Sequence, residues 1–249
     1  MKRAAYILFA ASFIVFLAGC ATAGKETLRT QKDPIALVSV VSNFDINWNG
    51  EDPTNPNNAA PASKRALRAN PDMTLVSNAD ELIGAAEGLF RDSMARSGLI
   101  YLADKETVLD SRAYREAGEN KVQMRTDFDI SVRKVKPEGY RFIDLGDKNF
   151  FPALAGETGI QRSIFLVFNF TKTMSSGLGK NGNCRAVVDM KVYILDSQGK
   201  TIFQKTYSDI RSLDTTKVTS GVYSETELMG LFKSAISDAC NTFLDDLGN

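Results

Sequence analysis

Histidine is missing from this chain of 249 residues. Its absence excludes Ser-His-Asp and Cys-His nucleophile pairs and the usual zinc sites. It also removes the side chain that most often transfers protons near neutral pH. A catalytic site would therefore need carboxylates, lysine or a metal bound by oxygen ligands. We expect a protein that is not an enzyme and that uses no cofactor.

An excess of charge of either sign is also missing, because 30 basic residues balance 30 acidic ones. Nucleic-acid binding and broad adsorption to anionic lipid both depend on clustered lysine and arginine. The charges here are interspersed, so the sequence argues against both kinds of partner.

The strongest positive feature is the amino terminus. Lys2 and Arg3 precede an apolar run over residues 4–17, which is the pattern of a secretory signal and is too short to span a membrane. The run closes on Leu17-Ala18-Gly19-Cys20, which resembles the lipobox of bacterial lipoproteins. The alternative is an ordinary signal peptide that happens to contain a cysteine.

The lipoprotein resemblance implies cleavage between Gly19 and Cys20, diacylglycerol on the Cys20 sulfur and acylation of the new amino terminus. Removing two basic residues with the signal, residues 1–19, leaves 28 basic against 30 acidic residues, a net charge of −2. Acyl chains would then provide the attachment, since each buried methylene contributes about 0.8 kcal/mol. We expect an envelope protein anchored by lipid, in the outer membrane and facing the periplasm.

Cysteine is scarce, and only Cys184 and Cys240 remain once Cys20 is modified. An oxidising compartment would permit a disulfide between them. Cys240, however, falls on the apolar face of an expected helix, where a free cysteine behaves as a small hydrophobic residue. The sequence favours two unpaired thiols and leaves the disulfide open.

Residues 35–249 read as one α/β (α+β) domain, a single mixed β-sheet covered by helices. Residues 20–34 form a lipidated tether that needs no fold of its own, and residues 35–41 form a strand buried on both faces. An irregular insertion then spans residues 43–73, with four of the seven prolines and seven asparagines.

The first half of the domain predicts alternating strands and helices. Apolar residues at three- and four-residue spacing predict a helix from Ser77 or Asn78 to Gly98. A short strand over residues 99–102 and a second helix from Asp104 to Ala117 follow. This order favours parallel pairing beneath packed helices.

The second half predicts more strand. We expect an edge strand at 128–135, a short helix at 149–157, a central strand at 163–170 and a flexible loop at 174–183. A hairpin follows, with strands at 185–195 and 202–210 and a turn at 196–199. A helix over residues 225–247 presents one apolar face and should cover the sheet.

Three patterns suggest ligand chemistry. Asp45, Asn47 and Asn49 match the opening of a calcium loop, but the twelfth position is Pro56, so turn formation is favoured. Residues 177–182 fail the phosphate-loop spacing and predict a hairpin loop. The acids of a third group read as solvated charges rather than a general acid and base; they are Asp127, Asp129, Asp144 and Asp147.

Trp48 is the only tryptophan and lies in the polar insertion. Tryptophan is enriched at recognition surfaces, so Trp48 is a candidate for partner binding. The alternative is that Trp48 folds back and covers the end of the sheet.

The order of elements from residue 35 to 247 is similar to the α/β periplasmic domains of envelope-assembly lipoproteins. Examples are the curli-secretion and penicillin-binding-protein-activator lipoproteins and the amino-terminal domain of TolB. The similarity rests on residues 98–104 after a long helix, the hairpin at 194–203, and the closing helix with Ala235, Ile236 and Asp238. A weaker resemblance is to treponemal outer-membrane lipoproteins.

These resemblances imply a lipid-anchored protein that binds or scaffolds another envelope component. One alternative is a lipoprotein that perturbs membranes through amphipathic helices. A hydrolase without histidine is a third hypothesis.

Overall fold

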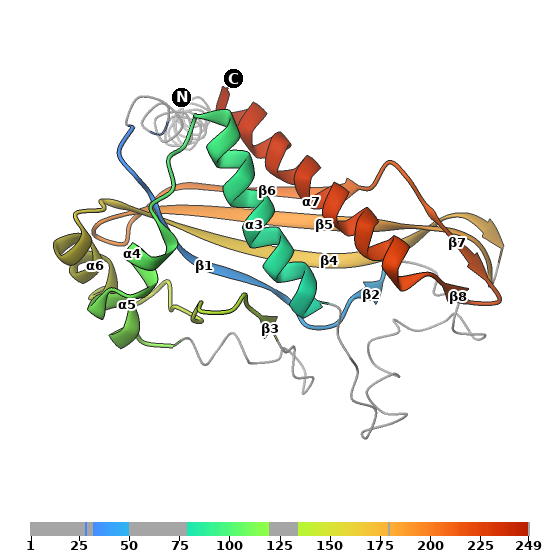
Figure 1. Ribbon diagram of the computed structural model, residues 1–249, viewed down its shortest axis with the longest axis horizontal. Helices are drawn as coiled ribbons and strands as arrows, with labels where there is room; N and C mark the ends of the chain where they lie inside the picture. Colours follow the sequence, from blue (N-terminus) through green and yellow to red (C-terminus); the bar gives the residue numbers. More distant parts are fainter. Residues whose placement is uncertain (1–27, 29–31, 50–78, 120–133, 179, 249) are drawn as a thin grey trace, which may run out of the picture.

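Two long antiparallel strands, β4 (Arg162–Leu178) and β5 (Asn181–Asp196), form the centre of the fold (Figure 1). The computed structural model describes residues 28, 32–49, 79–119, 134–178 and 180–248. Within this part, the strands form one mixed sheet with helices on both faces, which confirms the α/β prediction.

The remaining strands flank this central pair, some on the side of β4 and the others on the side of β5. On one side, β1 (Ala36–Asn43) lies parallel to the first half of β4, and β2 (Asn47–Trp48) lies parallel to a later stretch. β3 (Lys134–Val135) pairs antiparallel with β1. On the other side, β6 (Thr201–Arg211) and β7 (Thr216–Thr219) occupy successive parts of β5, and β8 (Val222–Tyr223) pairs with β7.

One face of the sheet is covered by the two longest helices, α3 (Ala79–Ser97) and α7 (Glu225–Gly248). The two helices pack against each other; α3 also contacts β1, and α7 contacts β5 and β6. Alternate residues of β4 and β5 point into this layer because side chains alternate along a strand. The apolar face predicted for the last helix is buried, including Phe232, Ile236 and Phe243.

The opposite face is covered by three shorter helices at one end of the sheet. They are α4 (Lys105–Leu109), α5 (Arg112–Glu116) and α6 (Phe150–Thr158). Phe150 and Phe151 of α6 pack with Tyr114 and Phe165 in a second, smaller core. The Tyr114 hydroxyl donates to the Val38 carbonyl oxygen at 3.0 Å, which ties α5 to β1.

Several expected elements match the structure closely. The strand at 35–41 is β1, buried along most of its length, and the helix at 149–157 is α6, which ends at Gly159 with φ 75°. The hairpin predicted around residues 196–199 joins β5 to β6, with Gly199 at φ 74°. A Cβ at Gly199 would lie 2.6 Å from the Phe151 ring, so glycine is required by both backbone and space.

Three expectations are wrong. Residues 99–102 make only an isolated bridge between Leu102 and Ile35, so the parallel partner of β1 is β4, far along the chain. The helix expected from Asp104 to Ala117 is broken into α4 and α5, because Ser111 leaves the helical conformation and caps α5 through the Tyr114 amide.

The third wrong expectation is the flexible loop at 174–183. Both strands continue through it until Leu178 pairs with Asn181, which leaves two residues to connect them. Of the edge strand at 128–135, residues 128–133 lie outside the described part, and β3 forms the rest.

Cys184 and Cys240 are both free and buried, as favoured by the sequence. Burial raises the pKa of the Cys240 thiol to about 12, and it also raises the pKa of Cys184. Both therefore serve as small core residues.

Candidate functional site at the distal end of the sheet

The sheet has two ends, which we call proximal and distal. At the proximal end, the chain enters β1: the Ile35 amide donates to the Tyr101 carbonyl oxygen at 2.8 Å, and Arg162 donates to the Asp33 carbonyl oxygen at 2.9 Å. The distal end holds β2, β7, β8 and the β4–β5 turn (Figure 1). β4 has 17 residues, so about 50 Å of strand separates the two ends at roughly 3.3 Å per residue.

Trp48 lies at the distal end. Its strand, β2, runs beside β4, and the following Asn49 amide donates to the Lys172 carbonyl oxygen at 2.7 Å. The Trp48 ring meets Tyr223 of β8 edge to face, with centroids 5.8 Å apart. Trp48 and Tyr223 are both half-buried, so the two rings close the sheet edge and still present part of their surface to solvent.

Lys172 holds this aromatic pair in place. Its ammonium lies 5.2 Å from the Trp48 centroid and 5.3 Å from the Tyr223 centroid. It also donates to the Ile46 carbonyl oxygen at 3.0 Å. A cation shared by two rings and a carbonyl is an arrangement that stabilises the site before any partner arrives. Trp48 therefore packs over the sheet end, as the second alternative predicted, and keeps part of its ring at the surface. Its role in partner binding stays a prediction.

The geometry around Asp45, Asn47 and Asn49 favours turn formation over calcium binding. Asn43 and Asn47 both donate side-chain amides to the Asp45 carbonyl oxygen, at 2.5 and 3.5 Å. The Lys172 ammonium donates to the carbonyl of Ile46, between Asp45 and Asn47 in the chain, and its positive charge disfavours a calcium ion nearby. Across the described residues, no three His, Cys, Asp or Glu side chains group as a metal site.

The β4–β5 turn forms the tip of the distal end. Gly177 (φ 119°) and Gly182 face each other across the strands. A Cβ at Gly177 would lie 2.2 Å from the Asn181 carbonyl oxygen, so only glycine permits the close approach. The turn is tied to the β7–β8 turn, since the Gly221 amide donates to the Lys180 carbonyl oxygen at 2.8 Å.

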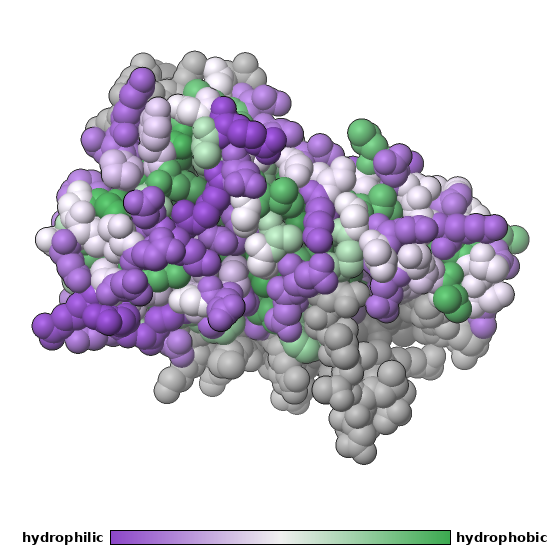
Figure 2. Space-filling model, in the orientation of Figure 1, coloured by the Kyte–Doolittle hydropathy of each residue, from purple (hydrophilic) through white to green (hydrophobic). Residues whose placement is uncertain are grey.

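Two aliphatic side chains project from this tip. Leu178 is 90% exposed and Val222 is 72% exposed. The register places Leu178 opposite Asn181 and Val222 opposite Thr219, so both lie among hydroxyl and amide groups. Figure 2 shows apolar side chains reaching the surface near β7 and β8, separated by polar ones.

The two turns of the tip carry lysines as their charged residues in the part of the chain that the structure describes. Residues 174–183 contain Lys180 as their one charged residue, and residues 215–224 contain Lys217. The nearest acids in the chain are Asp214 and Glu225, and Glu227 of α7 accepts a hydrogen bond from the Thr216 hydroxyl. Exposed aliphatic side chains flanked by lysines and small polar groups form a surface suited to an apolar pocket with acidic neighbours.

The other candidate residues have structural roles. Asp144 accepts from the Gly146 amide at 2.9 Å, and Asp147 accepts from the Asn149 amide at 3.0 Å, so both stabilise local turns. Asp127 and Asp129 lie outside the described residues. These contacts do not bring the predicted carboxylates into an acid–base pair.

One buried acid, Glu87, has several partners. It is 8% exposed and bonds to the Arg91 guanidinium and to the Tyr140 hydroxyl, the latter at 3.0 Å, with Lys105 at 3.6 Å. Desolvation raises the pKa of Tyr140 and keeps its hydroxyl protonated as a donor. The cluster fixes α4 and the Tyr140 segment to α3, which is a structural role.

The tether predicted over residues 20–34 is shorter than expected, because Leu28 already belongs to the folded core. Leu28 is 2% exposed, while Cys20, Gly19 and the rest of the signal segment lie outside the described residues. Among the described helices, none combines the length and apolar composition needed to cross a bilayer.

Sequence reasoning identified Trp48 but missed its partners. Lys172, Leu178, Val222 and Tyr223 carry no motif, and β7 and β8 are too short to produce a clear alternating pattern. The glycines at 177 and 182 are the one feature of the sequence that indicates the close approach of β4 and β5 at the tip. No protein-family model matches the chain, and no curated protein matches it.

Proposed function

We propose that this protein is a lipid-anchored component of the bacterial cell envelope that binds another envelope protein through its distal end. The anchor is Cys20, at the close of a Leu-Ala-Gly-Cys lipobox. The observation that carries the binding role is the pair of exposed aliphatic side chains, Leu178 and Val222, on a tip about 50 Å of strand from the end where the chain enters.

The chemistry of the tip favours a protein partner. A protein interface has an apolar centre within a polar rim, and Leu178 and Val222 among hydroxyl and amide groups could supply such a centre. Trp48, Tyr223 and Lys172 hold one another in a fixed arrangement next to the tip, so binding would order few side chains. The lysines at 180 and 217 would favour a partner with acidic groups around its pocket.

Membrane perturbation through amphipathic helices has less support. The apolar faces of α3 and α7 are occupied by the sheet, with Phe90 and Phe232 both fully buried. The hydrolase hypothesis gains no support from the buried acid Glu87, because Arg91 and Tyr140 engage its carboxylate.

The test is site-specific photocrosslinking in intact cells. A photoreactive residue replaces Thr219, which is exposed and pairs with Val222. We expect a crosslinked protein adduct that is lost when Leu178→Ser and Val222→Ser are combined. Leu213→Ser is the matched control, because Leu213 is 83% exposed but lies on the β6–β7 connection.

The adduct should persist in the Leu213→Ser protein. An adduct that survives the Leu178→Ser, Val222→Ser pair would show that the tip is not the binding surface. Crosslinking to lipid instead of protein would favour the membrane-acting alternative.

A further inference from the structure

The linker between α3 and α4, residues 98–104, exposes two large apolar side chains at the proximal end. Leu99 is 39% exposed and Tyr101 is 50% exposed, while Ile100 between them is 3% exposed. The chain bends at Leu99 and Ile100; Ile100 is buried, and its two neighbours stay at the surface. Leu99 and Tyr101 therefore both present apolar surface at this end of the domain.

The linker is held rigidly by the elements around it. Gly98 ends α3 with φ 63°, and the Leu99 amide donates to the Ser97 hydroxyl at 3.2 Å. Ile35 then bonds to the linker twice, accepting from the Ala103 amide at 2.9 Å and donating to the Tyr101 carbonyl oxygen at 2.8 Å. The exposed side chains are thus held in position by backbone hydrogen bonds.

The same contacts place the linker beside Ile35, which leads into β1. The Ile35 amide bonds directly to the Tyr101 carbonyl oxygen, so Tyr101 lies where the chain enters the sheet. Leu28 is buried in the main core, so only the eight steps from Cys20 to Leu28 precede the first described contact, a span of at most about 28 Å. A bilayer that holds the acyl chains lies within this reach of the domain.

We infer that the proximal end of the domain rests on the bilayer surface, with Leu99 and Tyr101 in contact with lipid. The inference depends on the proposed anchoring at Cys20. It commits to lipid because the anchor brings the membrane to this end and because tyrosine is enriched at membrane–water interfaces, where its ring is buried and its hydroxyl stays hydrated.

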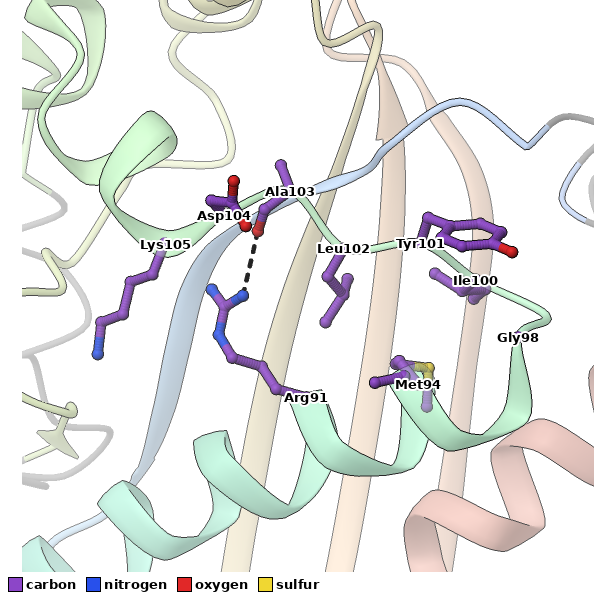
Figure 3. A pocket seen from close by; sticks show the side chains of 10 residues that line it. Arg91, Met94, Gly98, Ile100, Tyr101, Leu102, Ala103, Asp104 and Lys105 are labelled. Carbon is purple, nitrogen blue, oxygen red and sulfur yellow. Dashed lines mark hydrogen bonds between the residues drawn. The ribbon is translucent and has the colours of Figure 1, made fainter.

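Two open surface pockets beside the linker give lipid groups room to enter. One, of about 450 Å³, lies between α3 and the linker, where Met94, Ile100 and Leu102 lie close to one another (Figure 3). In the same view, Arg91 reaches across to the Ala103 carbonyl oxygen. The other, of about 610 Å³, has Leu99 in its wall together with the last turns of α3 and α7.

Charge at this end does not select anionic lipid. Arg91 and Lys105 beside the first pocket pair with Glu87. Arg96 at the end of α3 is balanced by exposed acids, Asp104 at the start of α4 and Asp245 near the end of α7. We therefore expect contact with zwitterionic lipid, with little dependence on salt. Trp48 lies well away from this surface: β1 meets β4 at Ser163 and Trp48 meets β4 at Lys172, nine residues or about 30 Å along the strand.

The experiment uses the full lipidated protein in phosphatidylcholine vesicles whose acyl chains carry bromine, a short-range quencher of tryptophan. Trp48→Phe removes the natural tryptophan, and Tyr101→Trp then places a single reporter at the proximal end. The matched control carries the reporter at the distal end as Val222→Trp in the same background. We expect Trp emission from position 101 to be quenched severalfold more than from position 222.

Each result supports or overturns the inference. Vesicle flotation with selective quenching at position 101 supports it. Flotation with no quenching at position 101, or with equal quenching at 101 and 222, overturns the inferred contact of the proximal end with the bilayer. The lipid anchor at Cys20 would still stand. Failure of the lipidated protein to float with vesicles overturns both the proposed anchor and the inferred contact of the proximal end with lipid.

A further reporter shows which side chains make the contact. Asn241→Trp, in the wall shared with Leu99, should be quenched in the otherwise native linker. Replacing Leu99 and Tyr101 with serine should reduce that quenching without affecting flotation. Undiminished quenching would refute the role assigned to these two side chains.

Discussion

Replacing Phe232 with alanine tests whether α7 is a structural cover of the sheet. Phe232 is fully buried, and its ring meets Phe170 of β4 edge to face with centroids 5.8 Å apart. The strand beneath is fixed, since Asn43 accepts from the Phe170 amide at 2.7 Å and donates to its carbonyl oxygen at 2.8 Å. The cavity left by the missing ring therefore has little freedom to collapse.

The expected loss follows from these contacts. Truncating a buried phenylalanine lowers the free energy of unfolding by about 3–5 kcal/mol, which includes the lost aromatic contact of about 0.5–1.5 kcal/mol. Alanine is the better helix former and offsets roughly 0.5 kcal/mol. Because β4 is pinned by Asn43, we expect a net loss in the same range, about 3–5 kcal/mol.

Urea unfolding of residues 21–249, followed by far-ultraviolet circular dichroism and by Trp48 fluorescence, measures this loss. Leu213→Ala is the control, because Leu213 is 83% exposed and its replacement should change stability by less than about 0.5 kcal/mol. The urea dependence should keep the same slope in all three proteins. A loss below about 1 kcal/mol for Phe232→Ala, with weakened liposome binding, would refute the structural role and favour a helix that lies on lipid.

Further predictions concern the anchor, a thiol and the tip. Cys20→Ala should leave an unprocessed or soluble protein, and palmitate labelling that persists would refute the lipoprotein assignment. Since the pKa of Cys240 is raised to about 12 in the folded state, stability should fall as pH rises from about 9 to 12, by up to about 1.4 kcal/mol per pH unit. In Cys240→Ala, chemical denaturation at the same pH values should show a smaller fall in the free energy of unfolding than in the parent protein. A fall equal to that of the parent would show that the buried tyrosines, and not Cys240, cause the pH dependence. Gly177→Ala should lower stability by about 1–3 kcal/mol and speed amide exchange at the tip, whereas Gly84→Ala on the open side of α3 should raise stability by about 0.5–1 kcal/mol.

The fold class could be predicted because its main elements carry strong periodic patterns. Helix α7 places apolar residues at helical spacing over 24 residues, and β1 is a largely apolar run of the kind that is buried on both faces. The hairpin of β5 and β6 has a glycine at its turn. Each of these signals is local, so each can be read from neighbouring residues.

The errors arise where contacts between distant residues decide the structure. Residues 99–102 have the composition of a strand, but β4 takes the place beside β1, and only Leu102 bridges to Ile35. Glycine and serine at 174–183 are typical of loops. The two facing glycines instead allow the backbones of β4 and β5 to approach more closely than larger residues permit, and the ladder continues to Leu178.

The candidate site was only partly predictable for the same reason. Trp48 is conspicuous because it is the only tryptophan, but its partners come from β4 and β8, more than a hundred residues later. The parallel pairing of β2 with β4 brings Lys172 under Trp48, and the β7–β8 hairpin adds Tyr223. An indole placed on this cation is fixed beside the tip, so any partner of the tip meets a surface that is already ordered.

The two exposed apolar sites lie at opposite ends of β4, which gives them distinct roles in the function we propose. Leu99 and Tyr101 lie on the linker that is bonded to Ile35, whereas Leu178 and Val222 lie at the far end of β4. An attachment near one end of a stiff sheet leaves the other end about 50 Å away to contact partners in the surrounding space. Loss of the proximal contact should therefore leave the tip intact but disturb its direction, which separates a failure of orientation from a failure of binding. Crosslinking from Thr219 in a protein with serine at positions 99 and 101 measures this directly: the adduct should weaken without being lost, and an unchanged yield would mean that the tip needs no fixed orientation.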